Sequence, residues 1–139
     1  MSFNSMESQF VIQNAMLATK LAKKVDGQLT VHGISFTEYM IMHNLNGSVL
    51  KTMRRIEIAE AVGISASGVT RLIAPMEKIG LVEKESNPRD ARQSLVKLSK
   101  AGQRLFDEAS VSFEHCSKSM LESLSPNQLE KLIELSARL

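Results

Sequence analysis

The sequence has little of what builds disulfides or membrane spans. Its 139 residues contain one cysteine, Cys116, which excludes an internal disulfide and suits a reducing compartment. No apolar run approaches the roughly 18 residues that a membrane-spanning helix needs, so we expect no membrane partner. The first residues lack a basic segment followed by an apolar block, and they therefore give no sign of a signal peptide. From these absences we expect a cytoplasmic protein.

The residue groups that carry catalysis are also missing. No serine, histidine and acid order, phosphate-binding loop or carboxylate cluster stands out, so we expect no enzymatic activity and no cofactor. The histidines His32, His43 and His115 do not lie four residues apart on a helix, and Cys116 has no second cysteine beside it. We therefore predict no metal site, although these four residues keep a metal- or redox-responsive protein open as an alternative.

What is present is typical of one globular domain, with 43% apolar and 23% charged residues. The net charge is only +2, but it is unevenly distributed. Residues 51–100 carry ten basic and six acidic groups. Residues 1–50 carry three basic and three acidic groups, and residues 101–139 carry four basic and six acidic groups. A basic excess confined to one segment suits a surface that binds phosphates.

Residues 55–80 have the pattern of two short helices joined by a tight turn. The first helix has apolar residues at near-helical spacing, Gly63 allows the turn, and Ser65 can cap the second helix. The apolar face of the first helix is Ile56, Ile58, Ala59 and Val62, and that of the second is Val69, Leu72, Ile73, Met76 and Ile79. Ser67, Thr70, Arg71, Ala74 and Lys78 lie on the opposite face of the second helix. Pro75 predicts a bend in the second helix, and Gly80 predicts its end. Two short helices joined in this way form a helix-turn-helix pattern, in which the second helix suits the major groove of DNA.

A hairpin is predicted directly after this second helix. Residues 81–85 form a strand candidate, residues 86–91 a turn-rich loop, and residues 93–98 a second strand that alternates at Ser94, Leu95, Lys97 and Leu98. Arg89 and Arg92 fall near the tip, where arginine suits a narrow minor groove, and the Asp90 carboxylate can hold an arginine extended. Residues 51–53 are a candidate third strand. Upstream, residues 35–38 predict a capping box for a helix that runs to about Leu45.

The chain ends carry apolar helices. A first helix over about residues 5–25 has two apolar stripes, which favour either a buried intrachain helix or one that also meets a partner chain. A long helix from Lys100 has a near-heptad seam that favours a partner helix, and a last helix begins at Ser125 and Pro126. We expect a homodimer interface in which the following residues take part: Phe10, Phe113, Cys116, Met120, Leu129, Leu132 and Leu135.

Six segments of the sequence, taken in order, resemble the winged helix-turn-helix of the MarR family of transcriptional regulators. They are residues 34–38, 58–65, 69–73, 80–83, 90–92 and 95–102. The acidic residue, spacer and arginine of the family wing fall on Asp90, Ala91 and Arg92, and Ser99 stands where the family usually has threonine. The resemblance implies a mainly α (α+β) fold and one MarR-like domain over residues 1–139. Residues 33–100 would then be the DNA-binding winged helix-turn-helix, and residues 1–30 and 101–139 the dimerisation helices.

The resemblance also implies a function. We expect a transcriptional regulator, a repressor, that binds an inverted repeat in double-stranded DNA as a homodimer. The expected DNA contacts are Arg54, Ser65, Ser67, Thr70, Arg71, Lys78, Arg89, Asp90 and Arg92. A small aromatic or anionic effector is implied in a cleft between the two regions, with Tyr39, His43 and Phe106 as candidate lining residues. A winged helix used only for protein contact remains an alternative, against which the basic pair Arg71 and Arg92 argues.

Overall fold

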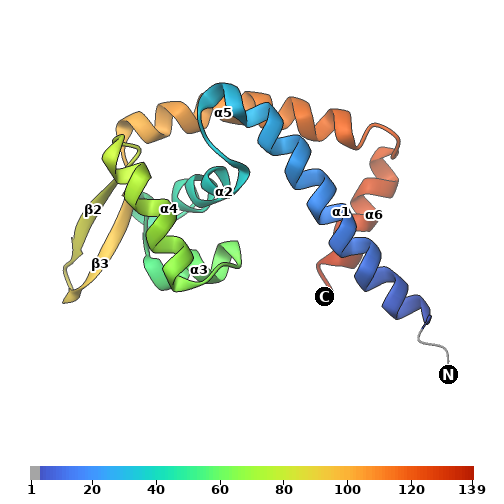
Figure 1. Ribbon diagram of the computed structural model, residues 1–139, viewed down its shortest axis with the longest axis horizontal. Helices are drawn as coiled ribbons and strands as arrows, with labels where there is room; N and C mark the ends of the chain where they lie inside the picture. Colours follow the sequence, from blue (N-terminus) through green and yellow to red (C-terminus); the bar gives the residue numbers. More distant parts are fainter. Residues whose placement is uncertain (1–3) are drawn as a thin grey trace.

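The computed structural model describes residues 4–139, which form six α-helices and a three-stranded antiparallel sheet (Figure 1). The helices are α1 (Met6–Leu29), α2 (Phe36–Asn46), α3 (Arg55–Val62), α4 (Ala66–Lys78), α5 (Lys100–Met120) and α6 (Pro126–Ser136). The strands are β1 (Thr52–Arg54), β2 (Val82–Asn87) and β3 (Asp90–Leu98). This confirms the predicted fold class, a mainly helical winged helix. None of the described helices is long and apolar enough to cross a membrane.

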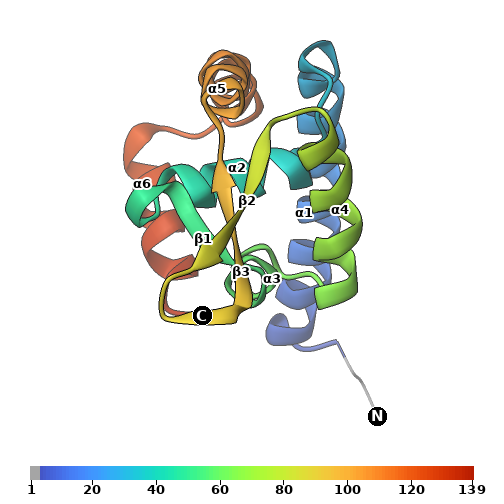
Figure 2. The same ribbon diagram turned by 90° about the vertical axis from the view of Figure 1, so that its left-hand side faces the viewer.

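The elements divide into two ends that α5 connects. Helices α2, α3 and α4 and the β2–β3 hairpin lie at one end, and α6 and the first half of α1 lie at the other (Figure 1). Seen from the hairpin side, α4 lies beside β2 and β3 (Figure 2). Both ends of the described chain therefore lie away from the winged part.

Serine side chains begin five of the six described helices. Ser5, Ser35, Ser65, Ser99 and Ser125 each accept a hydrogen bond from the backbone N–H three residues later, at 2.9–3.2 Å. Two of these caps are reciprocal, because Glu38 and Gln128 accept the backbone N–H of Ser35 and Ser125 at 2.8 and 2.9 Å. Such caps satisfy N–H groups that have no partner within the helix. They confirm the three helix starts that the sequence predicted at Ser35, Ser65 and Ser125.

The hairpin is longer and its turn tighter than predicted. Strand β3 lies in the middle of the sheet, between β1 and β2. Asn87 pairs with Asp90, so only Pro88 and Arg89 connect the strands, not a loop over residues 86–91. A register irregularity between Ser86 and Asn87 adjusts the strands to this two-residue connection. The third strand was predicted one residue too early, because β1 covers Thr52–Arg54.

Helix α1 ends later than predicted because its last turn is buried. The helix was predicted to end near Asp26 and Gly27, but it continues to Leu29. A glycine inside a helix costs about 1 kcal/mol relative to alanine. Val25 and Leu29 are 2% and 0% exposed, so the packing of this last turn offsets that cost.

Helix α4 also departs from its predicted pattern. It stops at Lys78, so that Ile79 is its C-cap and is 64% exposed, and Pro75 lies inside it; the bend expected at Pro75 stays a prediction. The buried face is therefore Val69, Ile73 and Met76, with Leu72 half-buried. Pro75 is exposed and lies in the last turn of the helix, where the N–H that proline lacks removes the usual donor to the carbonyl four residues earlier. In α3, Ile56 was placed on the apolar face but is 51% exposed.

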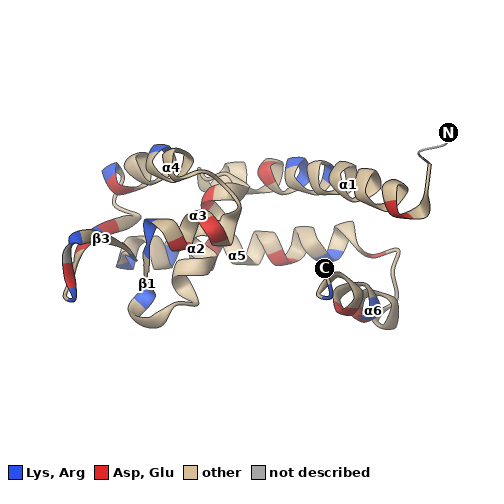
Figure 3. Cartoon of the chain, turned by 90° about the horizontal axis from the view of Figure 1, so that it is seen from below, with Lys and Arg blue, Asp and Glu red and all other residues tan. Residues whose placement is uncertain are grey.

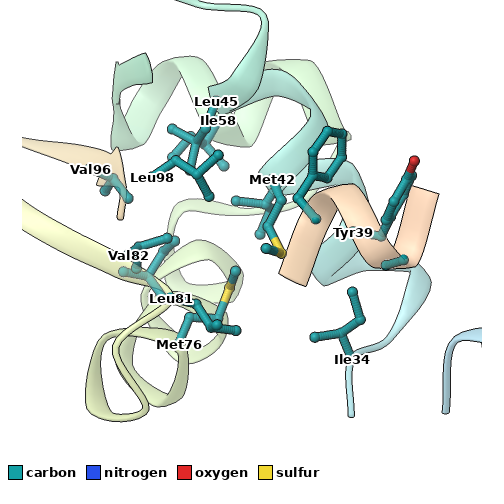
Figure 4. Packing of buried hydrophobic residues seen from close by; sticks show 14 of the residues in the cluster. Ile34, Tyr39, Met42, Leu45, Ile58, Met76, Leu81, Val82, Val96 and Leu98 are labelled. Carbon is teal, nitrogen blue, oxygen red and sulfur yellow. The ribbon is translucent and has the colours of Figure 1, made fainter. Parts of the chain in front are cut away.

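The core lies under the winged part and fixes the orientation of α4. Met76 of α4 and Val82 of β2 lie in the same cluster as Ile58 of α3 and Leu45 of α2 (Figure 4). In β3 the buried face is Val96 and Leu98, whereas Leu95 is half-buried. The alternation predicted at Leu95 and Leu98 was therefore wrong by one position, because side chains two residues apart share a strand face.

The seam of α5 packs within its own chain. Phe106, Ala109 and Cys116 are buried. The Phe113 ring stacks on Phe36 at a centroid distance of 5.8 Å and lies 4.7 Å from the Tyr39 ring. Met120 packs against the same core. Within its own chain the seam meets α1 and α2, which bury Cys116 and partly cover Phe113 and Met120. A part for these residues in a dimer interface stays a prediction.

The first half of α1 and all of α6 except Leu129 are exposed in the single chain. The exposed apolar residues of α1 are Met6, Phe10, Val11, Ile12, Met16 and Leu17, and those of α6 are Leu132, Ile133 and Leu135. Leu129 is half-buried. Of the two interpretations of the first helix, intrachain burial therefore holds only from about Leu21 onward.

Candidate nucleic-acid interface

The exposed face of α4 presents polar and basic side chains to solvent. Ser67, Thr70, Arg71 and Lys78 are all exposed, whereas the opposite face of the helix is anchored in the core. Among residues 4–139, no hydrogen bond or ion pair engages the guanidinium of Arg71. Its five donors are therefore available to an acceptor on another molecule.

The turn before α4 sets the angle of this helix. Gly63 has φ +74°, the left-handed region that favours glycine, and its N–H donates to the Ala59 carbonyl at 2.9 Å. Ser65 accepts the Gly68 N–H at 3.1 Å, and its hydroxyl lies 3.1 Å from the Ser67 hydroxyl. Ser65 therefore caps the helix, and both hydroxyls lie at its exposed N-terminal end.

The wing presents two arginines in different ways. Arg92 is 93% exposed, and its Nε lies 3.4 Å from Asp90 Oδ1. The same oxygen accepts the Arg92 backbone N–H at 3.0 Å, so Asp90 folds over the backbone and orients Arg92. Arg89 lies in the two-residue connection, where its N–H donates to Asn87 Oδ1 at 2.9 Å. In this geometry Asp90 acts on Arg92, and the two arginines form the basic tip of the wing.

Arg54 is committed to the start of α3. Glu57 Oε1 accepts both its backbone N–H at 2.9 Å and its Nε at 3.1 Å. The backbone N–H and then the guanidinium of Arg54 hold the pKa of the Glu57 carboxyl below its usual value. Arg54 must therefore break an intramolecular contact before its guanidinium can bind another molecule, whereas Arg71 need not.

Two further basic residues, which the sequence analysis did not single out, lie beside the exposed face of α4. Arg55 and Lys84 line, with Thr70, Ala74, Glu77 and Lys78, a surface cavity of about 400 Å³. One signal was available for Lys84, because it follows the buried Val82 by two residues and so shares its strand face. Figure 3 colours the positions of Lys and Arg blue on α4 and along the hairpin, with positions of Asp and Glu in red among them.

The three residues suggested for an effector cleft do lie together, but they fill the space between them. The Tyr39 and Phe106 rings stack at 5.1 Å, and the His43 ring lies 6.3 Å from Phe106. Tyr39 and Phe106 are 5% and 6% exposed, and the Tyr39 hydroxyl bonds to Ser110 at 2.9 Å. Tyr39 and Phe106 are therefore core residues and do not line an open cleft, whereas His43 is exposed beside them.

A different cavity, of about 540 Å³, lies between α1 and α5. Its walls include Lys23 and Lys24 from α1 and His115, Cys116 and Ser119 from α5. His32 lies elsewhere, with its Nε2 2.8 Å from the Ser112 hydroxyl. Within the described residues, no three His, Cys, Asp or Glu side chains come together as metal ligands.

Comparisons with known proteins agree with this geometry. Residues 32–93 match the model of the MarR family. The fold is similar to that of Sco3205, a MarR family transcriptional regulator from Streptomyces coelicolor solved in complex with DNA (TM-score 0.86, 24% identity, 99% of this chain and 88% of that chain). It is also similar to AbsC, a MarR family transcriptional regulator from the same organism (0.84, 21%, 97% and 93%). A mutant of MarR from E. coli, complexed with operator DNA, is similar as well (0.83, 16%, 97% and 98%).

Proposed function

We propose that this chain is a member of the MarR family, whose model its residues 32–93 match, and a sequence-specific DNA-binding transcriptional regulator. The observation that carries the proposal is the exposed face of α4 with its unpaired Arg71, next to a wing that ends in Arg89 and Arg92. Helix α4 enters a major groove, where Ser67, Thr70 and Arg71 meet base edges. The wing reaches the adjacent minor groove, whose negative potential attracts arginine.

The remaining predicted contacts take supporting parts in this proposal. Ser65 and Lys78, at the two ends of α4, face the DNA backbone, and Arg54 reaches a phosphate only by giving up its bond to Glu57. Asp90 orients Arg92 and does not itself contact the DNA. Arg71 and the wing arginines therefore carry most of the binding.

We also propose that the regulator is a homodimer. The first half of α1 and α6 lie at the end of the molecule remote from the wing (Figure 1), and they carry exposed apolar residues, among them Phe10 and Leu132. Burying them against a second copy contributes roughly 25 cal/mol for each Å² of apolar surface. A two-fold dimer carries two copies of α4, which suits an inverted repeat. Residues 1–30 and 101–139 would thus form the dimerisation region, and residues 33–100 the DNA-binding region.

Repression relieved by a small anionic effector completes the proposal. The cavity between α1 and α5 supports it, because Lys23, Lys24 and His115 outnumber the one carboxylate, Glu122, in the lining of a space of about 540 Å³. Both helices belong to the proposed dimerisation region, so an effector bound there would act on the dimer. Benzoate serves as a probe, titrated into the purified protein by calorimetry. We expect Lys24→Gln to bind benzoate more weakly than the parent. Equal binding heats for the variant and the parent would reject this cavity as the effector site.

Binding to random duplex DNA tests the DNA-binding proposal directly. We expect the affinity to fall steeply as salt rises, because neutralised phosphates release counterions. A winged helix used only for protein contact needs no such surface and would show no salt-dependent binding. That result would reject the proposed function in favour of the protein-contact alternative.

A further inference from the structure

A basic hollow lies between α4 and the wing. Its walls come from three elements: Arg55 at the start of α3, Lys84 on β2, and the α4 residues Thr70, Ala74, Glu77 and Lys78. Thr70, Ala74 and Lys78 are four residues apart and so form one stripe along the exposed side of α4. The hollow is therefore continuous with the surface proposed to read bases.

Strand parity places Lys84 in this hollow. Lys84 lies two residues after Val82, which is 2% exposed, so it shares the strand face that packs toward α4 but lies beyond the edge of the core. Its cross-strand neighbour on that face is Val96. Lys97, by contrast, lies on the other face of the sheet, with its Nζ 4.0 Å from the Glu85 carboxylate.

The hollow has an excess of positive charge. Arg55, Lys78 and Lys84 face one carboxylate, Glu77, whose Oε1 lies 3.5 Å from Arg55 Nη2. No ion pair engages Lys78 or Lys84 within residues 4–139. Two of the three cations are therefore available to an anion, and the exposed hollow admits one from outside.

We propose that this hollow holds a backbone phosphodiester of the bound duplex, with Lys84 and Lys78 as its main partners. The inference rests on the proposed function, in which α4 occupies a major groove and the wing occupies the next minor groove. One sugar–phosphate strand separates two such neighbouring grooves, so it crosses the surface between the helix and the wing. The hollow lies at that crossing, and it fixes the register of the recognition helix without reading sequence.

The test compares two lysine variants on DNA fragments selected by the parent protein. Lys84→Gln should weaken binding on every fragment alike and lower the slope of log affinity against log salt by up to about 0.9 for each half-site, the value of one phosphate contact. Lys97→Gln, a matched change on the opposite face of the same sheet, should leave the slope unchanged. Both lysines are solvent-accessible, so both variants should unfold at the parent's temperature.

Neutral methylphosphonate linkages, introduced one at a time into a fragment, locate the contact. The parent should lose affinity at one linkage in each half-site between the two grooves, and Lys84→Gln should lose less there, because only Lys78 still meets that phosphate. An unchanged salt slope for Lys84→Gln, or equal losses for parent and variant at every linkage, would overturn the phosphate site. Absence of salt-dependent binding by the parent itself would instead reject the proposed function, and this inference with it.

Discussion

At the scale of single residues, what matters is which cations are already engaged. Arg71 has no described partner, Arg92 is oriented by Asp90 but 93% exposed, and Arg54 is held by Glu57 through two hydrogen bonds. An arginine without an internal partner loses no contact when it meets DNA, whereas Arg54 must first break one. The contribution to DNA binding should therefore be larger for Arg71 and Arg92 than for Arg54.

Removing Arg71 should change sequence preference. A bidentate contact between arginine and a base contributes roughly 1–3 kcal/mol of discrimination, so Arg71→Ala should relax the preference at one position in each half-site. Competition between selected and altered fragments measures this. Equal weakening on all sequences would make Arg71 a phosphate contact.

Removing Arg92 should weaken binding without changing the fold. Its side chain is 93% exposed, and its only described partner is Asp90 at 3.4 Å, so Arg92→Ala should unfold at the parent's temperature. Titration of a selected fragment at physiological salt measures the loss. Arg104→Ala, which removes an exposed arginine from α5, is the control; parent-like affinity for Arg92→Ala would rule out the wing contact.

At the scale of elements, hydrogen bonds at the helix N-termini stabilise α3 and α4, and so the exposed face of α4. Ser65 begins α4, and the Glu57 carboxylate accepts the backbone N–H of Arg54 at the start of α3. The lowered pKa of Glu57 means that its carboxylate form stabilises the fold. This contribution is complete above the pKa of glutamate in the unfolded chain and is lost as pH falls through the lowered pKa.

The Glu57→Gln variant should show this pH dependence. Glutamine can still accept the Arg54 N–H, so only the charge is lost, at a cost of about 0.5 kcal/mol near neutral pH because the site is exposed. The difference from the parent should disappear in acid. Urea unfolding at several pH values measures it, with Glu60→Gln on the same helix as the control. A gap that widens as the pH falls would contradict the assignment.

Local chemistry explains which elements the sequence could predict. A serine cap depends on residues three apart, so the starts at Ser35, Ser65 and Ser125 were correctly predicted. Contacts distant in sequence decide the rest. Leu29 is buried by tertiary packing and extends α1 past Gly27, Asn87–Asp90 pairing shortens the wing turn, and α2 supplies the aromatic partners of Phe113. The cations of α4 were predictable from its helical period, but Lys84 joined them only through the register of β2.

At the scale of the whole molecule, α5 connects the winged part to an exposed apolar end (Figure 1). The apolar side chains of that end are less buried within the chain than the side chains of the α5 seam. Phe10 and Leu132 are 47% and 43% exposed, whereas Phe113 packs on Phe36 and Tyr39. Charge introduced at these two places should therefore have different effects.

Phe10→Glu should give folded monomers, because Phe10 is 47% exposed and takes no part in the hydrophobic core. Phe113→Glu should unfold the chain, because a carboxylate would replace a ring packed among aromatic side chains. Light scattering gives the mass, and thermal unfolding separates the two outcomes. A parent protein that is a stable monomer at micromolar concentration would remove the basis for the dimer.

Sequencing the DNA fragments selected by the purified protein tests the central claim most directly. A dimer that presents two α4 helices should enrich an inverted repeat whose half-sites are centred about 10 base pairs apart. Selection by Arg71→Ala in parallel should lose the preference at one symmetric pair of positions. Fragments without a shared repeat, or a repeat that Arg71→Ala enriches unchanged, would contradict the assignment of α4 as the helix that reads DNA.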